Sequence, residues 1–182
     1  VPEAIEDPCG AVMRGEVDAA LVFAPDESCT AHSVECFSDE MFAVMHIDHP
    51  FANRSFLSPA NFADEALILY TGKRHAFVDF VLAPAGVRPG RLRQVRMTEA
   101  IVELARAGQG IAVLAGWVLN DLGSRKDLAA VRITRGGYRR TWRALLSDQC
   151  PETIAAAFVN SVRKTGESIA SAEWRELLET AS

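Results

Sequence analysis

The chain has 182 residues, of which 49% are hydrophobic and 24% are charged, and its formal net charge is −5. This length and composition predict a globular protein with one domain or two small lobes, and they exclude a disordered chain. The acidic balance argues against direct binding to nucleic acid, which needs a basic surface, and the apolar runs are too short to span a bilayer.

Helix and strand signals alternate along the chain. Continuous apolar runs closed by glycine, proline or aspartate indicate buried strands, and capping residues followed by apolar positions at helical spacing indicate helices. This alternation predicts an α/β fold with mixed, mostly parallel sheets and flanking helices. In chain order we predict a helix at 8–14, strands at 17–23 and 41–47, a short helix from 59, a strand at 66–70, a helix at 76–86, a strand at 92–96, a helix at 98–107, a strand at 111–115, a helix from 117, strands at 128–134 and 138–148, a helix at 151–166 and an amphipathic tail at 171–179.

Particular residues are predicted to begin and end these helices. Asp7, Ser58 and Thr98 are suited to cap helix N-termini, and Gly166 is predicted to terminate the last helix. The apolar run at 17–23 is predicted to be a strand buried on both faces.

The four cysteines are Cys9, Cys29, Cys36 and Cys150, and no two of them form a C-x-x-C pair. In a chain of this size, free thiols in a reducing compartment are expected in preference to disulfides. A second group, the arginines at 135, 139, 140 and 143, flanks two aromatic residues. We interpret these arginines as a solvated strand edge or a contact with a partner, rather than a nucleic-acid site.

The sequence contains no strong catalytic, metal or cofactor motif. His46 and His49 are too loosely spaced for a metal site, and the segment at 71–74, TGKR, lacks the other residues of a phosphate loop. Neither a G-x-S-x-G elbow nor a G-x-G-x-x-G fingerprint occurs. We therefore predict no cofactor, no metal and no enzymatic activity.

Three stretches in order resemble the effector-binding domains of LysR-type transcriptional regulators. They are GEVDAALVF at 15–23, the stretch from MFAVMHIDHPFANRS to LSPANFADEALILYT at 41–71, and MTEAIVELARAGQGIAVLAGWVL at 97–119. The resemblance covers most of residues 7–165. DPCGAVMRGEVDAALV at 7–22 and TEAIVELARAGQGIAVLAGW at 98–117 are similar to the subgroup of methionine-biosynthesis regulators, which respond to homocysteine.

The resemblance implies a two-lobed fold similar to type 2 periplasmic binding proteins. Lobe one would comprise residues 1–46, lobe two 47–148, and 149–182 would return to lobe one and form a tail. The family's first strand and helix would precede residue 1, as would a winged helix-turn-helix that contacts DNA. The expected protein is a cytoplasmic transcription factor that senses a small anionic effector, with no membrane partner. The alternative is a stand-alone solute-binding protein of the same fold.

The resemblance implies that the effector binds in the cleft between the two lobes, and we expect the contacts where buried strands end and loops or helices begin. Arg96 and the N-terminus of the helix at Thr98 favour a carboxylate, and aromatic and sulfur-bearing side chains would supply an apolar wall. An amino or carboxylic acid with a short apolar or sulfur-bearing side chain, homocysteine in the subgroup, fits this set. The predicted effector-binding residues are Phe23, Ala24, Tyr70, Thr71, Gly72, Arg96, Met97, Thr98 and Trp117.

The resemblance also implies a homodimer, or a higher homo-oligomer, in which a lobe-one helix packs against a lobe-two helix. The two candidate helices are those at 8–14 and 76–82. Both carry apolar residues beyond what one sheet face needs: Val12, Met13, Phe77, Phe80 and Val81.

Overall fold

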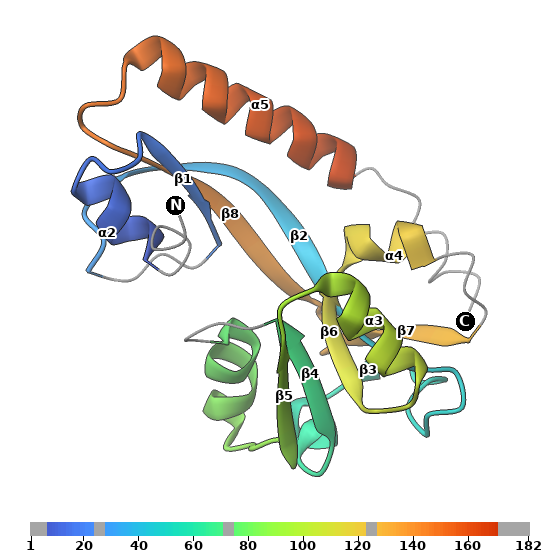
Figure 1. The fold of residues 1–182 in the computed structure, drawn as a ribbon. Coiled ribbons are helices and arrows are strands. Elements are labelled where there is room, and N and C mark those ends of the chain that lie inside the picture. The colour runs from blue at the N-terminus through green and yellow to red at the C-terminus, as the bar shows by residue number, and fades with distance from the viewer. Residues whose placement is uncertain (1–6, 24–27, 71–74, 123–126, 171–182) are drawn as a thin grey trace. The chain divides into compact units, whose positions relative to one another are not determined.

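The computed structural model describes residues 7–23, 28–70, 75–122 and 127–170 (Figure 1). These residues form two compact units. Unit 1 contains the described residues up to Asp39 and from Arg139 onwards, and unit 2 contains those from Glu40 to Tyr138. The predicted lobe boundaries, after residues 46 and 148, stay a prediction.

Unit 1 is a small sheet with a helix on each face. Its strands follow the order β1-β8-β2, and β1 is antiparallel to β8. Val12 of α2 packs with Leu145 of β8, whereas Val159 of α5 packs with Ala144. Because neighbouring residues of a strand point to opposite faces, α2 and α5 cover opposite sides of this sheet. The elements are α2 (Pro8–Met13), β1 (Ala19–Val22), β2 (His32–His46, continuing into unit 2), β8 (Tyr138–Leu146) and α5 (Glu152–Ala170).

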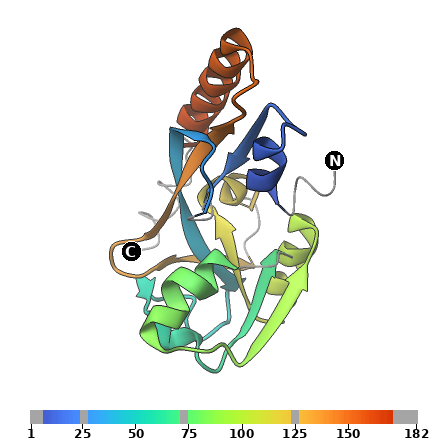
Figure 2. The same ribbon diagram turned by 90° about the vertical axis from the view of Figure 1, so that its left-hand side faces the viewer.

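Unit 2 contains a larger mixed sheet (Figure 2). Its strands follow the order β2-β6-β4-β5, and β7 pairs with both β2 and β3. The elements are β3 (Phe56–Leu57), η1 (Pro59–Phe62), β4 (Ala66–Tyr70), η2 (Val78–Leu82), η3 (Ala83–Ala85), β5 (Arg91–Val95), α3 (Thr98–Arg106), β6 (Ile111–Ala115), α4 (Gly116–Leu122) and β7 (Leu128–Ile133).

The core of unit 2 lies around β4 and β6. All five residues of β6 are buried, as are Leu67, Ile68 and Leu69 of β4. Gly110 allows β6 to begin close to β4, because its φ is +141° and a Cβ there would collide with the carbonyl oxygen of Ala66. The strands predicted at 66–70 and 111–115 are confirmed, and both are buried except at the ends of the first, where Ala66 is half-buried and Tyr70 is exposed.

The sheets contain more antiparallel pairing than predicted. Strand β4 is parallel to β5 and β6, and β3 is parallel to β7. Strand β2, however, is antiparallel to both β6 and β7, and β1 is antiparallel to β8. The parallel part is where helices connect successive strands, since a parallel pair needs a long crossover.

Several predicted boundaries were wrong. Strand β2 begins at His32 rather than Met41. Strand β1 is not buried on both faces, since Leu21 is 38% exposed. The last helix continues through Gly166, where the missing side chain leaves room for the ring of Phe37. The tail predicted at 171–179 lies outside the described residues.

The predicted helix caps had mixed outcomes. The Asp7 side chain accepts a hydrogen bond from the Gly10 N–H at 2.9 Å, as predicted. Ser58 is the N-cap residue of a short helix, as predicted. The backbone N–H of Ser58 donates a hydrogen bond to the side-chain oxygen of Asn61 at 2.8 Å. Thr98 is not a cap but the first helical residue, because the extended residue before the helix is Met97.

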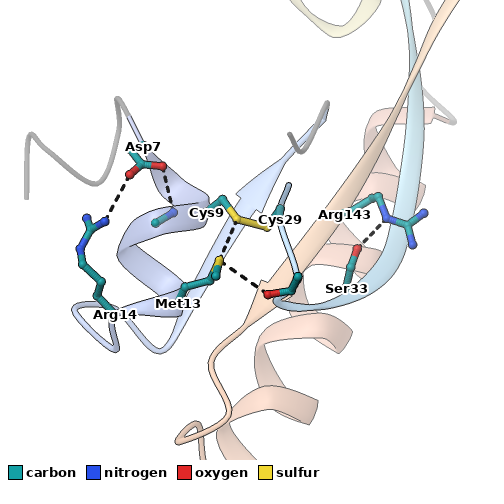
Figure 3. The surroundings of a disulfide bond; sticks show 9 residues. Asp7, Cys9, Met13, Arg14, Cys29, Ser33 and Arg143 are labelled. Atoms are coloured by element: carbon teal, nitrogen blue, oxygen red, sulfur yellow. Dashed lines mark hydrogen bonds and ion pairs between the residues drawn. A yellow bond between two sulfur atoms is a disulfide. The ribbon is translucent and has the colours of Figure 1, made fainter. Parts of the chain in front are cut away.

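A disulfide joins Cys9 of α2 to Cys29 before β2, so the expectation of four free thiols was wrong (Figure 3). The segment between them contains β1 and reverses direction, which brings the two Cα atoms to 5.9 Å, within the ordinary range for a disulfide. A separation of 20 residues in sequence does not reveal this reversal. Met13 Sδ lies 3.7 Å from Cys9 Sγ. Cys36 and Cys150 are free thiols, as predicted.

Candidate functional site

Three strand ends meet at one edge of unit 2. Strands β5, β4 and β6 are adjacent and parallel, so their carboxyl ends lie at the same edge of the sheet (Figure 1). The register pairs Tyr70 at the end of β4 with Val95 at the end of β5. Ligands of open α/β sheets bind outside such carboxyl ends. We call this edge the unit-2 edge, and its predicted residues are Tyr70, Arg96, Met97, Thr98 and Trp117.

The segment from Arg96 to Thr98 connects β5 to α3. Arg96 is exposed and Met97 is 62% exposed, whereas Thr98 is half-buried as the first residue of α3. Among the described residues no side chain caps the N-terminus of α3, so its first backbone N–H groups can donate hydrogen bonds to a ligand. An exposed guanidinium beside a helix N-terminus favours an anion.

Helix α3 is held in place by its apolar face. Ile101, Val102 and Ala105 are buried in the core of unit 2. At the other end of the helix, Arg106 donates a hydrogen bond to Glu103, which raises the pKa of Arg106. The positive charge of Arg106 complements the carboxyl end of the helix dipole. Packing and charge together fix the direction in which the N-terminus of α3 points.

Two aromatic residues provide apolar surface at the unit-2 edge. Tyr70 ends β4 and is 59% exposed, and Trp117 is the second residue of α4, directly after β6, and is 41% exposed. Part of each ring is therefore accessible to a ligand. An arginine, a helix N-terminus and exposed aromatic surface together suit a small anion that carries an apolar part.

The other predicted site residues lie elsewhere or outside the described residues. Phe23 belongs to unit 1, where it follows β1 and contacts Trp142 and Arg140. Ala24, Thr71 and Gly72 lie outside the described residues.

The interpretation of the arginine cluster was wrong for Arg140. Its side chain is only 13% exposed and forms an ion pair with Asp39, whose side chain is 2% exposed. Alternation along β8 places Arg140 and Trp142 on one face and Arg139 and Arg143 on the other. No local signal indicated that Asp39 lies opposite, because the predicted start of β2 came after that residue.

The other described surfaces offer fewer groups that could bind a ligand. A shallow groove of about 290 Å³ in unit 1 contains none of the predicted site residues. Within the described part of the chain, no three histidine, cysteine, aspartate or glutamate residues are grouped so as to hold a metal ion. The same residues include no helix long and apolar enough to cross a membrane. The residues that line the shallow groove of unit 1, named above, are Val34, Leu146, Glu152, Ala155, Ala156, Val159, Asn160 and Arg163.

Residues 4–167 match the LysR substrate binding domain. The chain belongs to this family. Among curated proteins it is 27% identical over 159 residues to the HTH-type transcriptional regulator MetR of Escherichia coli K12, covering 86% of this chain and 50% of that protein. MetR of Salmonella typhimurium LT2 is 26% identical over 159 residues, which again cover 86% of this chain and 50% of that protein. The chain therefore spans about half the length of these relatives, which are transcriptional regulators.

Solved structures support the predicted fold. The regulatory domain of MetR, a LysR family regulator from N. meningitidis, has a TM-score of 0.79 at 23% identity, with 89% of this chain and 76% of that chain covered. The reduced form of OxyR has a TM-score of 0.68 at 21% identity, with coverage of 85% and 74%. The two-lobed fold, similar to periplasmic binding proteins, is thereby confirmed for this LysR substrate-binding domain.

Proposed function

We propose that this LysR domain is the sensing part of a DNA-binding transcription factor in the cytoplasm, and that it has no enzymatic activity. A small anionic effector would bind at the unit-2 edge, and an N-terminal winged helix-turn-helix would carry the DNA contacts. Binding would change the relative populations of the domain's conformations, and so bias the DNA-binding domains. The names of the MetR relatives favour this function over a stand-alone solute-binding protein.

The observation that carries the proposal is that five of the nine predicted residues lie at one sheet edge of unit 2. Arg96 and the uncapped N-terminus of α3 would bind a carboxylate. Met97, Tyr70 and Trp117 would contact a short apolar or sulfur-bearing side chain. Phe23, Ala24, Thr71 and Gly72 stay contacts predicted from the sequence alone. Homocysteine, the effector of the subgroup that the sequence resembles, has this combination of groups.

The effector site is tested by replacing Arg96 with alanine and measuring homocysteine binding by calorimetry. Losing a charge-assisted hydrogen bond costs about 1.5–3 kcal/mol, so the affinity should fall about ten- to a hundredfold. Arg91→Ala is the matched control, because Arg91 is also exposed but lies at the opposite end of β5. Equal affinities for wild type and Arg96→Ala would move the site elsewhere. An absence of heat at millimolar homocysteine would remove this effector but not the fold.

We also propose a homodimer that forms through α2 and the helical segment at 76–82. Met13 and Phe80 support this assignment, since they are 54% and 58% exposed. Val12 and Phe77 do not, because both are buried in the cores of their own units. Sedimentation at tens of micromolar should give a dimer that Phe80→Glu dissociates, whereas a monomeric wild type would contradict the proposal.

A further inference from the structure

A hydrogen-bonded pair of polar side chains lies beside the unit-2 edge. Its members are His75, which directly precedes the helical segment at 76–85, and Gln94, the last residue but one of β5. Nε2 of His75 and the side-chain nitrogen of Gln94 lie 2.8 Å apart. Both residues belong to unit 2, and neither is among the effector-binding residues predicted from the sequence.

The pair lies at the same end of β5 as Arg96. The register pairs Tyr70 with Val95, and Gln94 is the residue directly before Val95. Gln94 and Arg96 are both exposed, and His75 is half-buried. Two residues of a strand span about 6.6 Å, a distance that the long side chains of glutamine and arginine can bridge. A small molecule bound by Arg96 would therefore lie within reach of Gln94.

The backbone on both sides of the pair is held by unit 2. The carbonyl oxygen of His75 accepts a hydrogen bond from the Asp79 N–H at 2.9 Å, which forms the first turn of the helical segment. Phe77 in that segment is buried, and its ring meets that of Phe62 edge to face, with centroids 5.1 Å apart. Gln94 is fixed by the pairing of β5 with β4. The two side chains are thus positioned before a ligand arrives, which lowers the entropic cost of binding.

The shared hydrogen bond leaves the pair with one free donor and one free acceptor. If the Gln94 amide nitrogen donates to His75 Nε2, the Gln94 oxygen remains an acceptor and His75 Nδ1–H remains a donor. If the amide is rotated, so that its oxygen accepts from Nε2–H, the free acceptor is His75 Nδ1. Among the described residues, neither side chain has a second hydrogen-bond partner. The neutral pair therefore offers an acceptor to a ligand in either arrangement.

An acceptor beside Arg96 would complete the recognition of an amino acid. Arg96 and the backbone N–H groups of α3 are donors, so they can bind a carboxylate but not an ammonium group. We propose that His75 and Gln94 form a specificity-determining pair that accepts a hydrogen bond from the amino group of the effector. This inference rests on the proposed function, in which Arg96 and α3 bind the carboxylate. It narrows the effector from a carboxylic acid in general to an amino acid.

The test compares two probes that differ only in the amino group, homocysteine and 4-mercaptobutyrate. Calorimetry on the 182-residue chain gives the affinity for each acid, and the ratio of the two affinities measures the contribution of the amino group. A hydrogen bond to a charged group corresponds to about ten- to a hundredfold in affinity, so wild type should prefer homocysteine by about that factor. Gln94→Leu should lower this ratio at least about tenfold, because the leucine side chain offers no acceptor.

Further variants assign the acceptor to the pair. His75→Phe should also lower the ratio, since the Gln94 amide loses the partner that orients it, whereas Gln94→Glu keeps an acceptor and should keep the preference for homocysteine. Gln109→Leu is the matched control, because Gln109 is also exposed but follows the opposite end of α3, and this variant should keep the wild-type ratio. Glu99, in the first turn of α3, is another acceptor, and Glu99→Gln should lower the ratio less than Gln94→Leu does.

The outcomes separate this inference from the proposed function. A ratio that Gln94→Leu or His75→Phe leaves unchanged, or an equal affinity of wild type for the two acids, would overturn the inference while the effector site stands. A larger response to Glu99→Gln than to Gln94→Leu would overturn it as well, because the ammonium group would then bind at α3. If wild type binds neither acid, the proposed effector fails and the inference fails with it.

Discussion

Unit 2 buries one continuous apolar core, whereas unit 1 divides a smaller core between the two faces of its sheet. The core of unit 2 includes residues of β4, β6 and α3, and fully buried large side chains such as Phe42, Phe62 and Met45 belong to it. Among the described residues of unit 1, the apolar cluster on each side of the sheet contains three buried side chains. Unit 1 adds a disulfide and a buried ion pair. A unit with a small core is stabilised by a covalent link such as this disulfide, because apolar burial alone barely offsets the entropy of folding.

The largest effect is expected in the core of unit 2. Ile68 is fully buried in β4, and Ile68→Ala should lower the free energy of unfolding by about 2–5 kcal/mol. The matched control is Leu92→Ala on neighbouring β5, where the side chain is 39% exposed and the loss should be about 0.5 kcal/mol. Urea unfolding followed by circular dichroism measures both. Similar losses for the two variants would mean that unit 2 does not depend on apolar burial in this way.

The next effect concerns the disulfide of unit 1. Removing it by Cys9→Ser with Cys29→Ser should cost about 3 kcal/mol, because the unfolded chain regains the entropy of an open loop. Hydrogen exchange should show lost protection in α2 and β1, with β4 and β6 unchanged. Cys150→Ser, which removes a free thiol, is the control. Equal loss of protection in both units would show that they unfold together.

The smallest effect concerns the contact between α5 and Phe37. Alanine usually stabilises a helix relative to glycine, by about 1 kcal/mol. At Gly166, however, a Cβ would collide with the ring of Phe37, so Gly166→Ala should destabilise by about 1–3 kcal/mol instead. At Gly136 a Cβ would meet nothing within 4 Å, so Gly136→Ala serves as the control. Thermal unfolding of both variants gives the sign, and a stabilised Gly166→Ala would contradict this packing.

The central strands of unit 2 could be predicted from sequence because their apolar runs are continuous. The runs at 66–70 and 111–115 are apolar along their whole length, and helical spacing marks the buried face of α3. The unit-2 edge followed from these strand ends, since carboxyl ends of parallel strands share one side of a sheet.

Unit 1 was harder to predict because its stabilising contacts join distant residues. The first half of β2 mixes polar and apolar residues without strict alternation, so it has no clear strand signal. Arg140 and Asp39 lie 101 residues apart, and neither carries a local mark of its partner. The disulfide was missed for the same reason, since a cysteine spacing does not show where the chain turns back.

The arginines of β5 have a consequence for aggregation. Strand β5 stands at the end of the strand order, and within the described residues it pairs only with β4. An unpaired strand edge is a template on which another chain can add a strand. Arg91 and Arg93 are two residues apart on β5, so their side chains project from the same face of the strand. A second copy adding there would bring like charges together and dehydrate them. The edge strand is therefore protected against forming a continuous sheet with neighbouring molecules when the protein is concentrated.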